Sequence, residues 1–269
     1  MKKLLLLCSV LSLSVLWPGD AIAQLKIGGK KLNTAKLLDA GKDVAKAVTL
    51  SDSDIAQLSR EAVAWMDANN PVADETTEYG ARLKRLTEGI TEVDGLPLNF
   101  KVYKVADVNA FACGDGSIRV FSALMDLMDD DELMAIIGHE IGHVVHADVK
   151  HAMKNAYLSS ATRNAAGAAE GSTLAKLSDS QLGEVVTAFT GAQFSQKQEY
   201  EADEYGFEFS VKNGFSPYGM GNSLNKLVEL SKGAKSSTVQ KMFSSHPDSE
   251  KRAARMKEKA DAYVAAHQQ

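Results

Sequence analysis

The sequence predicts a mainly α-helical protein of the α+β class, with one small β-sheet of two or three strands. Apolar residues recur at helical spacing over most of the chain, whereas strand-like alternation is confined to residues 98–122. There is no internal repeat and no clean domain boundary, so we expect residues 51–269 to form a single domain. A chain of 269 residues, 45% of them hydrophobic, is long enough to bury one large core.

The first helices and the strands follow from local signals. Asp52 or Ser53 can cap a helix that runs to about Asn69, where Pro71 ends it, and a second helix is expected over residues 75–89. Alternating apolar residues from 98 to 105 predict a strand. The CGDGS turn follows, and a second short strand is expected over residues 118–122.

The second half of the chain returns to helical periodicity. Carboxylates at residues 129–132 suit the start of a helix, because they offset the partial positive charge of its free amide groups. Residues 156–176 are rich in Ala, Ser and Gly, and either a closely packed helix or a mobile segment fits that composition. Further helices are expected over residues 180–212, 217–231 and 248–266.

Residues 1–23 are typical of a cleaved secretory signal peptide. Lys2 and Lys3 precede a short apolar stretch, and a small-x-small cleavage site ends at Ala23. The apolar stretch is short for a membrane span, and Cys8 lies too early to be a lipoprotein anchor. Residues 24–50 are expected to form a loosely held N-terminal arm. The mature protein is therefore expected outside the cytoplasm.

Composition argues against several classes of function. A formal net charge of -5 gives no basic patch for nucleic acid, so we expect no nucleic-acid partner. Cys113 would be the single cysteine of the mature chain and cannot form an internal disulfide. No G-x-S-x-G elbow and no phosphate-binding glycine loop is present, which argues against serine hydrolysis and nucleotide chemistry.

The strongest chemical signal is the stretch AIIGHEIGHVVHADVKH, residues 135–151, which contains four of the six histidines. In a helix, His139 and His143 are one turn apart on the same face, so both imidazoles can bind one zinc ion at about 2.0–2.1 Å. Glu140 lies roughly 100° round the helix, where it can take a proton from water instead of binding the metal. This pattern predicts one Zn²⁺ per chain and a hydrolytic reaction.

A third metal ligand must come from elsewhere. His146 would lie about 10 Å from His139 along an unbroken helix, too far to share one ion. His146 and His151 are therefore expected to be structural or surface residues. Glu199 and Asp203 are better candidates, because they share one helix face, and Asp203 could accept the second ring N–H of a ligating histidine. An ordinary acidic, solvent-facing helix remains the alternative for this pair.

Three motifs in order, GHEIGH, EYEAD and HPDSEKR, resemble those of the gluzincin metallopeptidases of family forty-eight, the HtpX and CAAX prenyl endopeptidase type. The resemblance covers about residues 52–257 and extends to periplasmic proteases of the family. It implies a gluzincin-like helical metalloprotease domain with the small sheet at its active site. It also implies that the zinc ligands are His139, His143 and Glu199. Glu140 would be the general base, and Asp203 would support a ligating histidine.

The same resemblance assigns further residues. His246 of the His-Pro pair would lie near the zinc, where it either stabilises the oxyanion or occupies the open coordination position and holds the enzyme inactive. Arg252 would position that loop or pair with an active-site carboxylate. An edge strand containing Asn109, Ala110 and Phe111 would bind an extended substrate as an added strand.

The function implied by the resemblance is a periplasmic zinc endopeptidase that cleaves misfolded or damaged envelope polypeptides. It leaves open a peripheral contact with the outer membrane or its assembly machinery, and the oligomeric state. The rival interpretation is a chaperone-like binding protein whose zinc site is proteolytically latent. One departure is Asp148, which stands where family members often have histidine.

Overall fold

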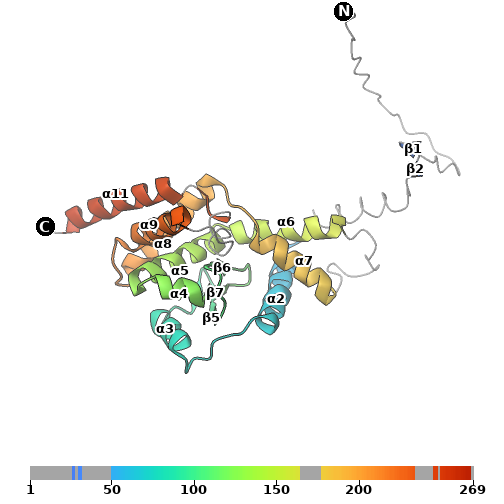
Figure 1. Cartoon of the computed structure of the whole chain (residues 1–269), viewed down its shortest axis with the longest axis horizontal. Coiled ribbons are helices and arrows are strands. Elements are labelled where there is room, and N and C mark those ends of the chain that lie inside the picture. The colour runs from blue at the N-terminus through green and yellow to red at the C-terminus, as the bar shows by residue number, and fades with distance from the viewer. Residues whose placement is uncertain are drawn as a thin grey trace, which may run out of the picture.

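The computed structural model describes residues 26–27, 30–31, 50–163, 177–233, 245–247 and 249–267. The expected signal peptide, most of the N-terminal arm and the segment 164–176 lie outside these residues. In the view of Figure 1, a small central sheet has α8, α9 and α11 on one side and α2 and α7 on the other. None of the described helices is long and apolar enough to cross a membrane.

Helices make up most of the described chain, which confirms the predicted fold class. Several begin with a side-chain cap, such as Ser51, Asp129 or Ser195, that accepts a hydrogen bond from the third residue of its helix. Their bounds are α2 Asp52–Asn69, α3 Glu78–Leu86, α4 Ser122–Leu127, α5 Asp130–Val145, α6 Asp148–Arg163, α7 Asp179–Thr190, α8 Gln196–Lys212, α9 Gly219–Gly233 and α11 Ser249–His267.

Two helix predictions need correction. The expected helix over 180–212 is two helices: α7 closes at Gly191, and Ser195 caps the new helix α8. Periodicity continued across this break because each helix has its own buried face. The expected helix over 75–89 is shorter, because Thr77 caps α3 by accepting the Gly80 N–H and the helix closes at Thr87. The short helix α4 was not predicted.

The central sheet has three strands in the order β5-β7-β6. Strand β5, Asn99–Tyr103, runs parallel to β7, Ser117–Phe121, and β6, Ala110–Ala112, runs antiparallel to β7. Strand β6 is therefore at an edge, as the resemblance implied. Shorter two-stranded ladders pair β1, Lys26–Ile27, with β2, Lys30–Lys31, and β3, Glu92–Val93, with β4, Leu96–Pro97.

Helix α5 runs through the core and packs most closely on α8. Every residue from Glu132 to Val144 is buried. Glycines permit the close approach of the two helices: a Cβ atom added at Gly206 of α8 would lie 2.7 Å from the backbone nitrogen of His139, and one at Gly138 would lie 3.0 Å from the Gly206 Cα. This close approach brings the metal motif of α5 within side-chain reach of α8.

Helix α2 is held to the sheet by a buried ionic group. Arg119 of β7 is 1% exposed and donates two hydrogen bonds to Asp67 of α2, at 2.9 and 3.1 Å. The Tyr103 hydroxyl donates to the same carboxylate at 2.6 Å. Burial and its own hydrogen bond to Asp67 raise the pKa of Tyr103, so its hydroxyl stays a donor. The group is structural and lies apart from the residues of the metal motif.

Candidate metal centre

His139 and His143 come from consecutive turns of α5 and face each other. Their Nε2 atoms are 3.1 Å apart, and the two side chains are 7% and 0% exposed. Two ligands of one tetrahedral zinc ion, each bonded at about 2.0–2.1 Å, lie about 3.4 Å from each other. The spacing of the two nitrogens therefore suits a shared metal ion.

Glu199 enters the same space from the first turn of α8. Its Oε1 lies 3.4 Å from the His143 Nε2, and its Oε2 lies 3.8 Å from the His139 Nε2. Burial raises the pKa of this carboxyl, but His246, His143 and His139 together hold it well below its usual range. Glu199 is therefore an ionised, fully buried oxygen donor beside two imidazole nitrogens.

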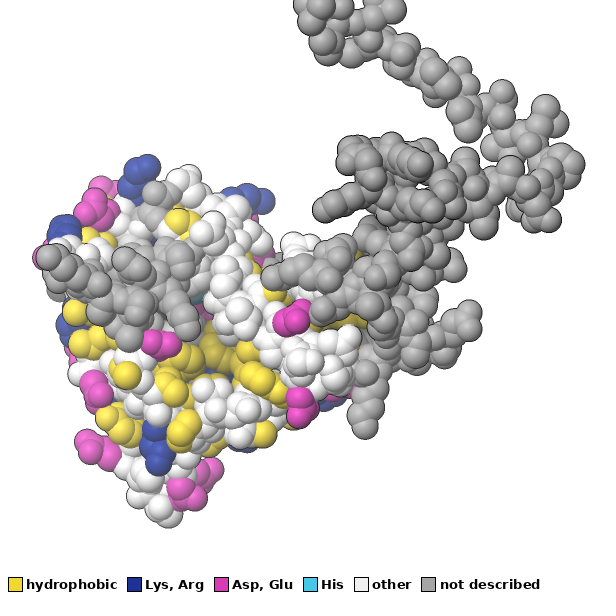
Figure 2. All heavy atoms as spheres, turned by 45° about the vertical axis from the view of Figure 1, so that its right-hand side comes forward, with side chains coloured by type: hydrophobic (Ala, Val, Ile, Leu, Met, Phe, Trp, Pro, Cys, Tyr) yellow, Lys and Arg dark blue, Asp and Glu magenta, His cyan; other side chains and the backbone are white. Residues whose placement is uncertain are grey.

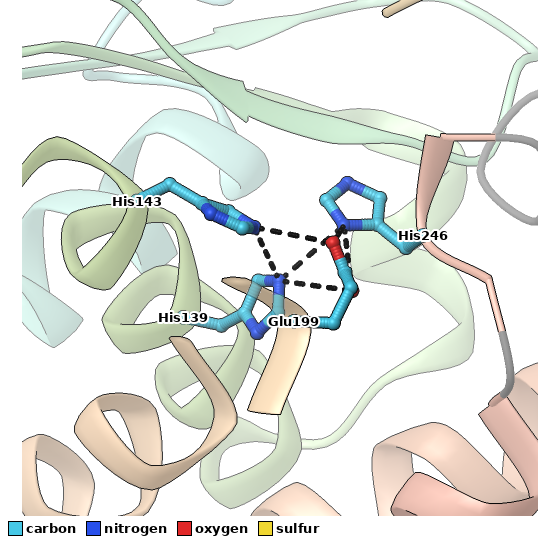
Figure 3. A group of neighbouring side chains, drawn as sticks. All are labelled: His139, His143, Glu199 and His246. Atoms are coloured by element: carbon cyan, nitrogen blue, oxygen red, sulfur yellow. Dashed lines mark hydrogen bonds and ion pairs between the residues drawn. The ribbon is translucent and has the colours of Figure 1, made fainter. Parts of the chain in front are cut away.

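His246 completes the cluster from the segment that precedes α11. Figure 3 shows His139, His143, Glu199 and His246 converging on one point, and their donor atoms all lie within 4.8 Å of one another. The His246 Nδ1 is 3.0 Å from the Glu199 Oε1 and 3.4 Å from the His139 Nε2. In this conformation His246 stands at a fourth corner of the donor set. Nitrogen and carboxylate donors in this arrangement fit zinc.

Glu140 lies next to the cluster without joining it. It is 2% exposed, and its Oε1 has no hydrogen-bond partner among the described residues. That oxygen is 3.8 Å from the His246 Nε2. A buried polar atom without a partner is costly in a folded protein, so such an atom at a site points to a group that meets solvent or substrate.

His139 is oriented by a chain of buried charges. Its Nδ1 is 2.9 Å from Asp203, which in turn accepts two hydrogen bonds from Arg252, at 2.6 and 2.7 Å. Arg252 also contacts Glu199. Burial raises the pKa of Asp203, but the Arg252 hydrogen bonds outweigh it and hold that pKa below its usual range. Asp203 and Arg252 therefore lie together behind His139.

His143 has a separate set of partners. Its Nδ1 is 2.9 Å from Asp148, whose other oxygen accepts a hydrogen bond from Gln198 at 2.6 Å. The ring of Phe194 stacks on the imidazole, with centroids 4.0 Å apart and planes 19° from parallel. Burial lowers the pKa of His143, but the carboxylates of Asp148 and Glu199 outweigh it and raise the pKa to about 9. The carboxylates of Asp148 and Glu199 therefore give this imidazole a negatively charged surrounding.

Sequence reasoning noted Asp148 only as a departure from the family at an accessory position, and it missed Gln198 and Phe194 as parts of the site. Asp148 lies five residues after His143, a spacing that would not bring the two side chains together on a continuous helix. The chain turns at Ala147, which has φ 61°, and this turn brings Asp148 back toward α5. A helix that ends just after a motif histidine, followed by an acidic residue, is the signal that could have found it.

The other histidines of the motif stretch lie outside the cluster. His146 caps the end of α5 and is exposed, and His151 is exposed on α6. Cys113 is fully buried, and burial raises the pKa of its thiol well above the usual value, which makes it a poor nucleophile.

The edge strand β6 packs on α5. Asn109 and Cys113 each form a backbone hydrogen bond to β7. Because hydrogen-bonded and non-hydrogen-bonded residue pairs alternate along an antiparallel ladder, the N–H and C=O groups of Ala110 and Ala112 face away from β7. The family resemblance implied Asn109, Ala110 and Phe111 for this edge. Of these, only Ala110 directs its backbone groups to the open side, and the predicted set misses Ala112.

A cavity adjoins the cluster at His139 and His246. Its walls combine apolar side chains with two serines, Arg252 and residues of the site. The residues lining it are Ile136, His139, Glu140, Met220, Ser223, Leu224, Leu227, His246, Ser249 and Arg252. Figure 2 shows hydrophobic side chains gathered in a hollow on one face of the molecule.

The fold and the site together define a metallopeptidase in which one helix carries a His-Glu-x-x-His motif and a second helix carries a glutamate. The chain belongs to peptidase family M48, whose family model, described as "Peptidase family M48", matches residues 79–260. Membership confirms the resemblance to family forty-eight and the assignment as a metalloprotease.

Several relatives carry protease names. The chain is 39% identical to Metalloprotease LoiP of Escherichia coli (strain K12), over 90% of this chain and 94% of that protein. It is 37% identical to Metalloprotease YcaL of the same organism, over 85% of this chain and 88% of the relative. It is 30% identical to the Beta-barrel assembly-enhancing protease of the same organism, over 61% of this chain but 35% of that longer protein.

Proposed function

We propose that this protein is a zinc-dependent endopeptidase of the cell envelope, with His139, His143 and Glu199 as metal ligands and Glu140 as general base. The observation that carries the proposal is the donor set of His139, His143 and Glu199, with His246 at its fourth corner, beside a Glu140 Oε1 that has no hydrogen-bond partner among the described residues. A structural zinc site is closed by four protein ligands and has no use for a free base, so Glu140 beside the donor set favours a catalytic site whose fourth position His246 can vacate.

Each residue then has a distinct task. A bound zinc ion supplies Lewis-acid polarisation of the substrate carbonyl and lowers the pKa of water. Glu140 accepts a proton from the attacking water and passes it to the leaving amine. Asp203 accepts the Nδ1–H of His139, so that its Nε2 lone pair faces the metal, and Arg252 holds Asp203 in place.

The edge of the sheet supports a polypeptide substrate. The backbone groups of Ala110 and Ala112 can form hydrogen bonds with an extended chain. That chain would add to β6 as a further strand, antiparallel or parallel, beside α5. The small cavity beside Glu140 has a mainly apolar lining, which favours an apolar side chain next to the scissile bond if the cavity widens on binding. Backbone recognition with one apolar subsite suits unfolded chains of varied sequence.

The envelope role rests on the N-terminal segment and on the relatives. Residues 1–23 have the charge and apolar pattern of a cleaved signal peptide, which supports periplasmic localisation. A relative is named as a protease that enhances β-barrel assembly, which supports a contact with an assembly machinery; misfolded or damaged envelope proteins as substrates are part of the proposal.

Removing the metal is expected to abolish proteolysis reversibly. Treatment with a chelator should stop cleavage of casein, and one equivalent of Zn²⁺ should restore it, because two histidines and a glutamate alone cannot activate water. The measurement is casein hydrolysis with metal content determined in parallel. Undiminished cleavage by protein shown to be free of metal would contradict the proposal.

Replacing His246 by alanine is expected to separate its two assigned roles. In the present geometry its Nδ1 occupies a corner of the donor set, which favours a resting form in which His246 blocks the open position. We therefore expect His246→Ala to raise casein cleavage. A severe loss would instead support oxyanion stabilisation, and an unchanged rate would reject both roles. Zinc content should be measured alongside.

A further inference from the structure

The metal site has two carboxylate supports, one on each histidine, and only one of them belongs to the Glu-x-x-x-Asp motif. Asp203 holds His139 from α8, whereas Asp148 holds His143 from the start of α6, each at 2.9 Å from the ring Nδ1. Both carboxylates are buried, with Asp203 0% and Asp148 5% exposed. Each histidine therefore has a buried carboxylate at the same distance from its Nδ1, although the two carboxylates come from different helices.

Asp148 reaches His143 because α5 stops. His146 closes the helix, and Ala147 adopts φ 61°, a conformation that costs a residue with a Cβ atom of order 1 kcal/mol. Helix α6 then begins at Asp148. A strained residue persists only where its surroundings compensate for it, and here Asp148 makes two hydrogen bonds within the site.

The second bond of Asp148 extends its influence to a different ligand. Its Oδ1 accepts a 2.6 Å hydrogen bond from Gln198, which directly precedes Glu199. The Gln198 Oε1 accepts bonds from the backbone N–H and the hydroxyl of Ser195, at 2.9 and 2.8 Å, in the capping box of α8. Both the nitrogen and the oxygen of the Gln198 side-chain amide are thus hydrogen-bonded. Gln198 thereby connects the first turn of α8 to Asp148.

We propose that Asp148 is a positioning residue of the metal site, which fixes the His143 imidazole directly and the α8 turn that carries Glu199 through Gln198. As acceptor of the Nδ1–H, Asp148 selects the tautomer whose Nε2 lone pair faces the metal. Gln198 prevents the carboxylate from rotating away. This inference rests on the proposed function, because it assumes that His143 and Glu199 bind the metal.

The test compares zinc affinity among four proteins: wild type, Asp148→Ala, Asp148→Asn and Asp179→Ala. Asp179→Ala is the matched control, because Asp179 is also an acidic residue in the first turn of a helix but is exposed on α7. Competition with a chromophoric chelator measures the zinc dissociation constant. Melting of the metal-free proteins measures folding separately.

We expect Asp148→Ala to weaken zinc binding about 10- to 100-fold, the usual effect of removing a hydrogen-bond partner of a ligating histidine. Asp148→Asn should fall in between, since it keeps an acceptor oxygen but loses the charge, and it serves if the alanine variant does not fold. Asp179→Ala should bind zinc as wild type does. In casein hydrolysis at saturating zinc, kcat should fall in both Asp148 variants while KM stays close to wild type.

Two results would overturn the inference: zinc affinity of Asp148→Ala within twofold of wild type, or equal weakening in Asp179→Ala, which would indicate a general effect on folding. Failure of the proposed function would look different. In that case the wild-type protein itself would bind no zinc at the cluster.

Discussion

Glu140→Gln is expected to abolish casein cleavage while zinc remains bound. Glutamine keeps the size of the side chain but cannot accept a proton from water at neutral pH. Loss of a general base slows a reaction by about 10²- to 10⁴-fold. Glu140 is outside the four-residue donor set, and its Oε1 has no hydrogen-bond partner among the described residues, so its replacement by glutamine should leave the fold and the metal ligands in place.

The measurement pairs casein hydrolysis with metal analysis of the same samples. Glu201→Gln is the matched control, because Glu201 is an exposed glutamate on α8, two residues from Glu199. That variant should cleave casein at the wild-type rate. If Glu140→Gln and wild type cleave equally, the protease mechanism is wrong; if Glu140→Gln loses its zinc as well, Glu140 supports the metal instead.

Arg252→Met is expected to cause the largest loss of stability. Arg252 is 2% exposed, donates two hydrogen bonds to Asp203 and contacts Glu199, and both carboxylates are fully buried. Its removal leaves two buried negative charges without their cation. Breaking a buried ion pair from one side costs about 3–5 kcal/mol of unfolding free energy.

The control for this prediction is Arg255→Met, one turn of α11 away. Arg255 pairs with Glu204, but its side chain is 45% exposed, and pairs of that kind contribute about 0–1 kcal/mol. Urea unfolding of the metal-free proteins should separate the two variants by several kcal/mol. Equal midpoints would show that Arg252 does not neutralise the buried carboxylates in the way that its contacts indicate.

The two predictions distinguish a residue that acts in catalysis from one that stabilises the folded site. Glu140 is expected to affect the reaction without affecting the fold, and Arg252 is expected to affect the fold and, through Asp203, the histidine that faces the metal. The rival function, a binding protein with a latent zinc site, predicts no effect of Glu140→Gln on any activity. Cleavage by wild type together with none by Glu140→Gln separates the two functions.

Much of the site follows from helix geometry, which local sequence encodes. A spacing of four residues places His139 and His143 on one face of α5 and sets Glu140 to the side, and the rise per residue along the helix excluded His146, which is exposed in the structure. Apolar periodicity likewise predicted the mainly helical fold. These features depend on residues within a turn or two of each other, so one sequence is sufficient to predict them.

Contacts between distant segments were decided by the tertiary structure. The approach of α5 to α8 depends on Gly138 and Gly206, and the place of His246 depends on the segment before α11. The role of Asp148 depends on the left-handed backbone conformation of one residue, Ala147, which helical periodicity does not reveal. The physical reason is that helix spacing is a local property, whereas packing between helices and the path of a turn are set by the whole core.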